Sequence, residues 1–281
     1  GNSFHYLGGV GLQICGHRKL TEPDVNKYNE IVDNDIHHCG EIQWSATGLF
    51  VKQSGENHIH HNSIHDQPHN GIMLGGMNSP SREELLALGI TPPDDDADPV
   101  EAYRLALEFI PCRNNIIEHN DVYRVMERLG DGNGMYINGA GSGNIVRRNR
   151  FHDITGFGCQ SALRTDDHQS GTTMRENLIY RCVGGGITLK QINDIENNII
   201  ACLLPKELPD GTISPPDGYI LLRRGPSNGS RILRNILYHE GGAQKFYCEG
   251  KIKRWPLAFV RECRTDSNTY FCTEDEQFAQ E

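Results

Sequence analysis

Three carboxylates in two short segments have the residue types and setting for acid–base chemistry. Asp131 lies in the Gly-rich segment R-L-G-D-G-N-G-M-Y, and Asp166 and Asp167 are adjacent in A-L-R-T-D-D-H. If these segments border β-strands, strand alternation places Arg164 and Lys190 beside Asp166. A carboxylate among cations is held in its ionised form, so Asp166 is predicted to act as a base or nucleophile rather than as an acid.

A repeat along the chain indicates which elements position these side chains. The pattern small-x-Φ-x-x-N-x-Φ, where Φ is apolar, occurs seven times at steps of 28, 58, 29, 28, 21 and 37 residues. Its Asn residues are Asn34, Asn62, Asn120, Asn149, Asn177, Asn198 and Asn235, and Asn268 is expected to mark an eighth copy. We predict that they stack as a ladder of amides hydrogen-bonded from coil to coil, at a turn where Asn tolerates left-handed backbone.

Short segments of alternating apolar residues lie between the copies of this repeat. They are G-L-Q-I at 11, G-L-F-V at 48, G-I-M-L at 71, G-M-Y-I at 134, A-L-R-T at 162, G-I-T-L at 186, Y-I-L-L at 219 and, more weakly, P-L-A-F at 256. Each is typical of a short strand. The sequence therefore predicts an all-β chain, a single-stranded right-handed parallel β-helix of about eight coils, forming one domain over residues 1–281.

Three segments interrupt the repeat beside the same row of strands. They are residues 15–28, 77–113 and 203–218. The longest is predicted to form two helices: Ser79 or Ser81 caps the first, Gly89 ends it, and the D-P-x-E sequence around Pro99 begins the second. We expect the helical insertion to stand beside the outer face of the strand at 71–74. The three segments together would then wall a groove across this sheet.

Strand alternation separates core residues from those that face the groove. The predicted core row is Leu12, Leu49, Ile72, Met135, Leu163, Ile187 and Ile220. The first outward row is Gln13, Phe50, Met73, Tyr136, Arg164, Thr188 and Leu221, and the second is Cys15, Lys52, Gly75, Asn138, Asp166, Lys190 and Arg223. The residues predicted to bind a substrate are Arg164, Lys190, Tyr136, Asn138, Arg223, Lys52 and His69.

Composition excludes several classes of function. The chain carries 27 Lys+Arg against 37 Asp+Glu, a net charge of −10, which is unlike a protein that binds nucleic-acid phosphates. No apolar run approaches the 18 residues needed to cross a bilayer, so no membrane insertion is expected. No nucleotide-binding glycine motif follows a strand, and the nine Cys include no C-x-x-C. The predicted groove face is locally basic, which favours an anionic ligand.

The histidines were considered as metal ligands. His58 and His60 share an outer face at i, i+2, a spacing that can bind zinc. However, His37, His65 and His152 recur three residues after the ladder Asn, where other copies of the repeat carry Tyr123, Tyr180 and Tyr238. This column is typical of a packed outer stack, so we predict no metal site and no cofactor. A structural or substrate-bridging Ca²⁺ would be expected only if the protein were a lyase.

The segments M-E-R-L-G-D-G-N-G-M-Y-I, A-L-R-T-D-D-H-Q-S-G and I-E-N-N-I-I-A-C carry a resemblance. With the intervening coils, over about residues 29–202, the chain resembles the bacterial right-handed β-helix proteins around glycoside hydrolase family 141, in the pectate-lyase-like superfamily. The resemblance implies a carbohydrate-active enzyme that is secreted or periplasmic and whose natural chain is longer at both ends. Asp131 and Asp166 match the positions of acidic catalytic residues. The chain departs from the group in having Arg164 before D-D and I-T-L-K after it.

Two reaction types fit the sequence. In glycoside hydrolysis Asp166 would act as the base with Asp131 or Asp167 as the acid, their carboxyls lying about 5.5 Å or 6.5–9.5 Å apart. In a polysaccharide lyase Lys190 or Arg223 would remove a proton from a uronic acid while Arg164 or a bound cation neutralises its carboxylate. The first prediction is hydrolysis of a poly- or oligosaccharide, with anionic glycans among the candidate substrates. A non-catalytic glycan-binding β-helix is the third alternative.

Overall fold

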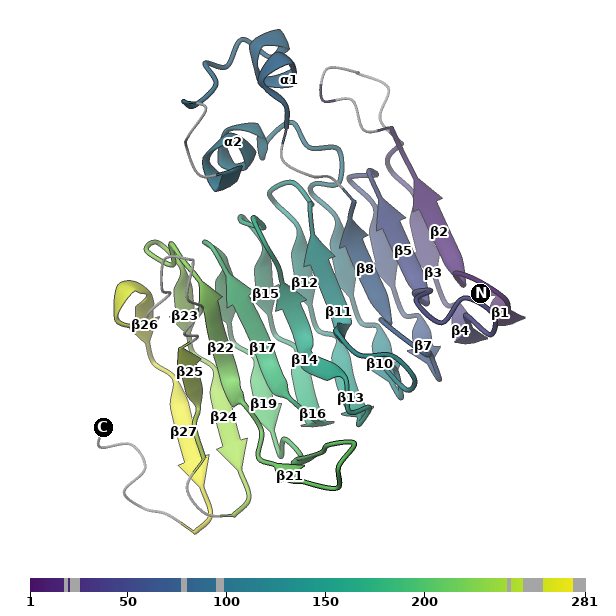
Figure 1. Cartoon of the computed structure of the whole chain (residues 1–281), viewed down its shortest axis with the longest axis vertical. Coiled ribbons are helices and arrows are strands. Elements are labelled where there is room, and N and C mark those ends of the chain that lie inside the picture. The colour runs from purple at the N-terminus through teal and green to yellow at the C-terminus, as the bar shows by residue number, and fades with distance from the viewer. Residues whose placement is uncertain are drawn as a thin grey trace.

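The structure, a computed structural model, describes residues 1–17, 20, 26–76, 80–94, 99–241, 244–249 and 260–274. Within this part of the chain, three parallel sheets form the three faces of a coil (Figure 1). Each full coil contributes one strand to each of the three sheets, and the next coil pairs with it strand by strand. The predicted all-β parallel β-helix with a small helical insertion is confirmed.

The strands of each sheet follow one another in coil order. Sheet 1 contains β1 (Ser3–Leu7), β4 (Asp35–Cys39), β7 (Ser63–His65), β10 (Asp121–Tyr123), β13 (Arg150–Ile154), β16 (Leu178–Cys182), β19 (Ile199–Ala201), β24 (Ile236–His239) and β27 (Thr269–Cys272). Sheet 2 contains β2 (Leu12–Cys15), β5 (Leu49–Lys52), β8 (Ile72–Gly75), β11 (Gly132–Asn138), β14 (Cys159–Thr165), β17 (Gly185–Lys190), β22 (Gly218–Arg224) and β25 (Tyr247–Glu249). Sheet 3 contains β3 (Glu30–Val32), β6 (His58–His60), β9 (Ile116–Glu118), β12 (Ile145–Arg147), β15 (Thr173–Arg175), β18 (Asp194–Glu196), β23 (Arg231–Leu233) and β26 (Arg264–Asp266).

The remaining elements interrupt the coils. They are α1 (Arg82–Ala87), α2 (Pro99–Ala106), the antiparallel pair β20 (Lys206–Glu207) and β21 (Ile213–Ser214), and a 3₁₀ turn at Val260–Glu262. Among the described residues, neither α-helix has the length and apolar character that crossing a membrane requires. The weak strand expected at 256 lies outside the described residues, and β25 is the last strand of sheet 2.

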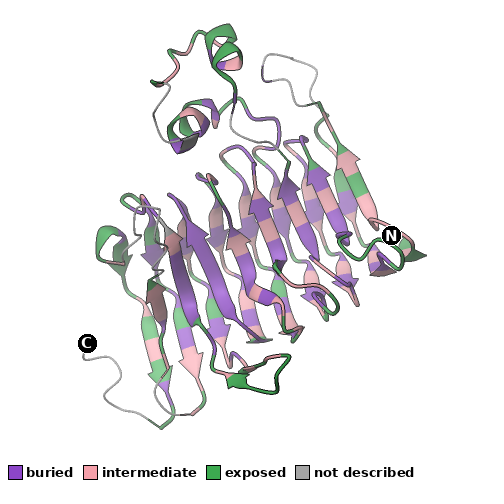
Figure 2. Cartoon of the chain, in the orientation of Figure 1, coloured by how far each residue is buried: buried purple, intermediate pink, exposed green. Residues whose placement is uncertain are grey.

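The core is built from the inward residues of all three sheets. In sheet 2, Leu49, Ile72, Met135, Leu163 and Ile187 are fully buried and lie in register, as strand alternation predicted. Figure 2 shows the buried positions running along the strands of the coil. Alternation succeeds here because each outward side chain meets solvent or a loop, while each inward one meets the opposite sheets.

The predicted Asn ladder is confirmed, and the structure extends it to nine members, from Asn2 to Asn268. Each side-chain oxygen accepts from the backbone and side-chain N–H groups of the Asn in the preceding coil, as Asn149 does from Asn120. One detail of the prediction is wrong: from Asn34 to Asn268, the left-handed backbone belongs to the residue before the Asn, such as Arg148 with φ 55°. The Asn amide bridges that turn instead of adopting its conformation.

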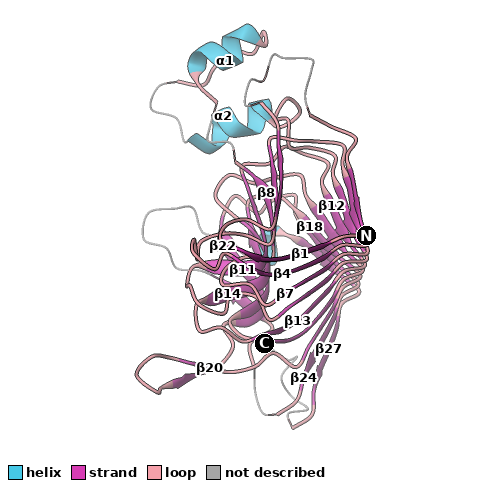
Figure 3. Ribbon diagram, turned by 90° about the vertical axis from the view of Figure 1, so that its right-hand side faces the viewer, coloured by secondary structure: helices cyan, strands magenta, loops and turns pink. Residues whose placement is uncertain are grey.

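Two further columns run parallel to this ladder. Asn29, Asn57, Asn115 and Asn144 form a second amide ladder at the turn into sheet 3. The outer column predicted as an aromatic stack is confirmed from His37 to Tyr180, since His37, His65, Tyr123, His152 and Tyr180 stack at centroid distances of 4.7–5.0 Å. Ala201 interrupts the column before Tyr238, which stacks on Phe271 instead. Figure 3 shows how closely the turns repeat from coil to coil. Cys39 and Cys182 are thiols buried in the core.

The helical insertion forms as predicted but covers a different surface. Ser81 caps α1 through a capping box with Glu84, and α2 begins at Pro99; Ser79 and Asp98 lie outside the described residues. The Tyr103 hydroxyl donates to the Ala140 carbonyl at 2.6 Å, so the insertion packs on the turn that follows β11. The insertion therefore lies beyond the carboxyl ends of the sheet 2 strands (Figures 1 and 3). The expectation that it would stand beside the outer face of sheet 2 is wrong.

Candidate functional site

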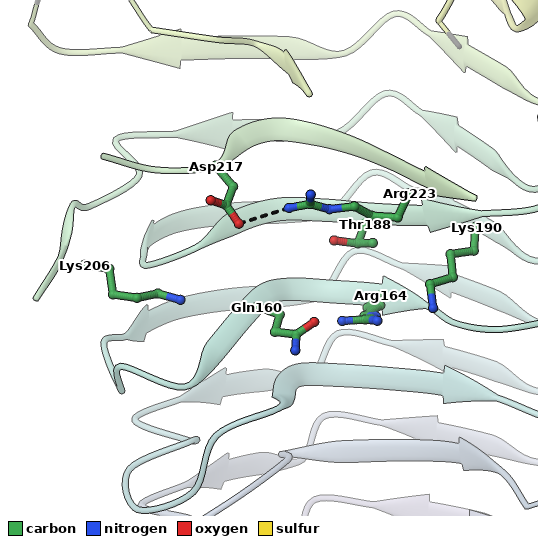
Figure 4. A pocket seen from close by; sticks show the side chains of 7 residues that line it. All are labelled: Gln160, Arg164, Thr188, Lys190, Lys206, Asp217 and Arg223. Atoms are coloured by element: carbon green, nitrogen blue, oxygen red, sulfur yellow. Dashed lines mark hydrogen bonds and ion pairs between the residues drawn. The ribbon is translucent and has the colours of Figure 1, made fainter. Parts of the chain in front are cut away.

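A pocket of about 310 Å³ lies on the outer face of sheet 2, where β14, β17 and β22 meet the loop that precedes β22 (Figure 4). Its lining residues are Gln160, Arg164, Thr188, Lys190, Lys206, Asp217 and Arg223. Four of these, Arg164, Thr188, Lys190 and Arg223, were predicted from strand alternation to face a groove. The lining contains four basic side chains and one carboxylate, so the pocket is locally cationic on a chain of net charge −10.

Asp166 is not part of the lining but contacts two residues that are, Arg164 and Lys190, and both of its carboxylate oxygens are engaged. Its Oδ2 accepts from the Arg164 guanidinium at 2.7 Å and from the Tyr136 hydroxyl at 3.0 Å. Its Oδ1 is in contact with the Lys190 ammonium and accepts from the Asp167 backbone N–H at 2.6 Å. The side chains of Asp166, Arg164 and Lys190 are only 9–11% exposed. These contacts favour an ionised Asp166 that holds the two cations and Tyr136 in place.

Tyr136 is the half-buried neighbour of this ion pair. Its hydroxyl accepts from the Asn138 amide at 3.1 Å while donating to Asp166, so the predicted substrate-binding residues Tyr136 and Asn138 form one network with it. Burial raises the pKa of Tyr136, and the nearby Arg164 partly opposes that shift. Burial also lowers the pKa of Arg164, whose Nε is buried without a hydrogen-bond partner.

Two residues of the 203–218 loop complete the pocket. Lys206 donates to the Cys159 carbonyl at 2.9 Å, and Asp217 pairs with Arg223 at 3.0 Å. Figure 4 shows Lys206 and Asp217 on one side of the pocket and Lys190 on the other. Among the described residues of the three predicted walls, those that line the pocket belong to this Pro-rich loop.

Other predicted site residues lie outside the pocket lining. Asp131 directly precedes β11 and accepts from Gln160 at 2.5 Å. Asn138, the neighbour of Asp166, is seven residues further along, which corresponds to about 23 Å of extended strand. His69 packs close to Gly132 at the same end of β11, and burial lowers its pKa. Lys52 lies on β5, three strands from β14, or about 14 Å along the coil axis.

A register shift changes one predicted neighbour. Between Leu189 and Lys190 the pairing of β17 with β22 slips, so Lys190 is opposite Arg224 instead of Arg223. Arg223 still faces the pocket, two residues beyond Leu221, but Leu221 itself is fully buried. The outer face of sheet 2 is thus covered at Leu221, whereas the pocket reaches it at Arg164 and Thr188.

Three lining residues, Gln160, Lys206 and Asp217, were not among the predicted site residues. Gln160 was missed because the strand at 162 was expected to start later; β14 begins at Cys159, and a shift in pairing with β11 leaves Gln160 as an extra residue. Lys206 and Asp217 lie in the loop predicted as a wall. The signal that could have identified them is their charge, in a loop next to the predicted basic row of sheet 2.

The pocket lining does not fit a Ca²⁺ ion. Calcium requires six to eight oxygen ligands, rich in carboxylates. The described lining offers one carboxylate, that of Asp217, which is already paired with Arg223. The cationic side chains that line the pocket would repel a metal ion and attract an anionic group instead.

Comparisons with known proteins agree with the fold. A family model for the right-handed β-helix region matches residues 101–204. The chain is similar to a solved structure described as an alginate lyase from Paenibacillus sp. str. FPU-7, with 12% identity and a TM-score of 0.56 over 96% of this chain and 78% of that one. A second similar structure is described as XylC in complex with xylose, with 13% identity and a TM-score of 0.51 over 87% of this chain but 42% of that one. Among curated proteins no match is found.

Proposed function

We propose that this protein binds an anionic, uronate-containing polysaccharide in the pocket on sheet 2 and cleaves it by β-elimination. The observation that carries the proposal is the excess of cations in the pocket: Arg164, Lys190, Lys206 and Arg223 against Asp217. An acidic chain that gathers four cations into one pocket is suited to an anionic ligand. The fold similarity to a structure described as an alginate lyase agrees with this class of substrate.

The cations supply the first requirement of the reaction. Removal of the proton beside a uronate carboxylate builds negative charge on that carboxylate, and a preorganised guanidinium or ammonium stabilises it. Arg164 is well placed because it lines the pocket and its guanidinium is fixed by Asp166. Lys190 is held in its charged form by Asp166 and Asp167, which suits the same neutralising role better than that of a base.

Tyr136 is the group we assign to proton transfer. Its hydroxyl can both accept and donate a proton, and it lies on the same outer face, beside Arg164. In this mechanism Tyr136 first loses its hydroxyl proton to solvent, and the resulting phenolate oxygen takes the proton next to the carboxylate. The electron pair of that C–H bond forms the C=C bond in the sugar while the bond to the leaving oxygen breaks. The leaving oxygen is then protonated by Tyr136 or by solvent. Positioned acid–base catalysis of this kind contributes about 10²–10⁴-fold.

Hydrolysis, the first prediction from the sequence and from the resemblance to glycoside hydrolase family 141, is less well supported by this geometry. The base role of Asp166 requires a free lone pair, whereas its contacts with Arg164, Lys190, Tyr136 and the backbone occupy both oxygens. Asp131 lies at the start of β11, where it accepts from Gln160 and its charge acts on Arg164 and Tyr136, and it is not among the groups that contact Asp166. Asp167, 53% exposed, is the remaining candidate acid.

The experiment is an assay of the purified protein on polymannuronate, polyguluronate, polygalacturonate, glucuronoxylan and neutral xylan. Elimination generates new reducing ends together with the ultraviolet absorbance of an unsaturated uronate, whereas hydrolysis generates reducing ends alone. We expect both signals on an acidic polymer and loss of both in Tyr136→Phe. Tyr123→Phe, in the stack on sheet 1, is the matched control. Reducing ends without absorbance would overturn elimination in favour of hydrolysis, and binding without products would indicate a glycan-binding module.

We further propose that residues 1–281 fold as one domain that acts outside the cytoplasm, secreted or in the periplasm, where polysaccharides occur. Continuous strand pairing from β1 to β27 in sheet 1 supports a single unit. Limited proteolysis in the insertions should therefore leave the cut pieces associated, so that they elute together as one particle in size-exclusion chromatography. Fractionation of the producing cell tests the location, and recovery in the cytoplasm alone would contradict it.

A further inference from the structure

A cluster of potential metal ligands lies on sheet 3, away from the pocket on sheet 2. Glu30 on β3 is directly opposite His58 on β6, and His60 follows two residues later on the same face. Coil stacking therefore adds a carboxylate to the two imidazoles that share one side of β6. This third group is 28 residues from His58 in the sequence, and spacing within the histidine run does not reveal it.

The distances are close to those of a coordination shell. One ligand atom from each residue lies within 4.8 Å of the other two, and His60 Nε2 is 3.2 Å from Glu30 Oε1. The rings of His58 and His60 have centroids 4.0 Å apart. Bonds of about 2.0–2.1 Å in a tetrahedral site place the ligand atoms about 3.4 Å apart. Small side-chain rotations would thus bring all three atoms onto one ion.

We propose that Glu30, His58 and His60 bind one divalent transition-metal ion, with Zn²⁺ as the representative ion. Two imidazoles and one carboxylate are a ligand set that suits zinc, copper and nickel, whereas calcium and magnesium prefer oxygen ligands alone. Glu30 is 66% exposed, so solvent has access to the remaining coordination position. Glu30 and the two histidines belong to neighbouring coils, and the ion joins them.

Outer contacts hold the two rings in place. His58 Nε2 is 2.7 Å from Glu118 Oε1, which leaves Nδ1 of this ring for the ion. Glu118 is itself bonded to Arg147 at 2.7 Å and is 11% exposed. His60 Nδ1 lies 2.8 Å from His61 Nδ1, which leaves Nε2 facing Glu30. A carboxylate or other group on the second ring nitrogen is the usual support of a metal-binding histidine, since it fixes the tautomer and the ring orientation.

The test is calorimetric titration of the tag-free chain with ZnCl₂ at neutral pH, together with thermal melting with and without Zn²⁺. We expect one saturable ion per chain and a higher melting temperature of the parent when Zn²⁺ is present. Glu30→Gln and His60→Gln should each weaken binding by more than about 100-fold, and Glu118→Gln by about 10- to 100-fold, as for an outer partner.

His38→Gln is the matched control. His38 forms an equivalent Nδ1···Nδ1 contact of 2.8 Å with His37 but does not belong to the three-ligand cluster. This variant should bind Zn²⁺ as the parent does. Because Glu30 is largely exposed, Glu30→Gln should fold normally even if a histidine variant does not. The proposal is overturned if the parent binds no ion at a stoichiometry of one, or if Glu30→Gln leaves the affinity unchanged.

Discussion

The role of Asp166 is best tested by replacing it with Asn, which keeps its shape and removes its charge. The substitution leaves the nearly buried cations Arg164 and Lys190 without their shared carboxylate. Removing one partner of a buried ion pair costs about 3–5 kcal/mol. At roughly 2 °C per kcal/mol for a chain of this size, the melting temperature of Asp166→Asn should fall by about 6–10 °C.

Anions should restore part of this loss. Sulfate or an acidic oligosaccharide can neutralise the two uncovered cations, so the added salt should stabilise Asp166→Asn more than the parent. Thermal melting followed by circular dichroism, over a series of sulfate concentrations, measures both effects. Asp167→Asn is the control: its side chain is 53% exposed and contacts Lys190 at 3.4 Å, so the free energy of unfolding should change by less than about 1 kcal/mol.

The opposite outcome would refute the assignment of Asp166 as a positioning residue. If Asp166→Asn melts with the parent and gains nothing from sulfate, its contacts with the cations do not stabilise the fold. If its catalytic rate also falls by more than about 100-fold, Asp166 acts directly as an acid–base group. The hydrolytic mechanism predicted from the sequence would then regain its base.

Three further predictions concern the ladder, the outer stack and the pocket. Asn149→Ala leaves buried amide and carbonyl groups unpaired at about 1–3 kcal/mol each, so its urea midpoint should fall well below that of Asn2→Ala at the exposed end of the ladder. Hydrogen bonds from Arg124 hold the pKa of Asp66 well below its usual 3.8, so the stabilisation is complete above that pH and is lost as pH falls further; Asp66→Asn should flatten this acid limb of the melting temperature. Because burial raises the pKa of Tyr136, kcat/KM should keep rising with pH up to and beyond about 10 if this residue is the base; a plateau near neutrality would assign the proton to another group.

The sequence predicted those features of the fold that depend on one residue per coil. The ladder Asn, the core row through Leu163 and the outward row through Arg164 recur at a fixed place in each coil, so a repeat search finds them despite unequal spacing. The second ladder was missed, although the small polar residue five positions before each ladder Asn was part of the pattern. Its side chains were treated as turn residues, because the pattern does not show that they contact one another.

The limits of prediction appear where the coils are irregular. The pairing shift before Lys190 and the extra residue Gln160 arise from local backbone geometry, which strict alternation ignores. The helical insertion was correctly predicted as two helices. Its position over the turn after β11 depends on Tyr103 and Ala140, which are 37 residues apart and share no periodic signal.

Asp166 shows why a candidate catalytic residue requires contact geometry as well as residue type. Alternation correctly placed this carboxylate beside Arg164 and Lys190, and from that neighbourhood an ionised group was inferred. What alternation omits is how many lone pairs remain available, and the contacts of Asp166 with Tyr136 and the backbone add to those of the two cations. Once both oxygens are engaged, Asp166 offers no lone pair to a substrate, and the charge that lines the pocket is that of Arg164, Lys190 and the other cations. In the sequence, Asp166 with Arg164 and Lys190 beside it indicates hydrolysis. In the folded chain the same three residues support binding of an anionic sugar instead.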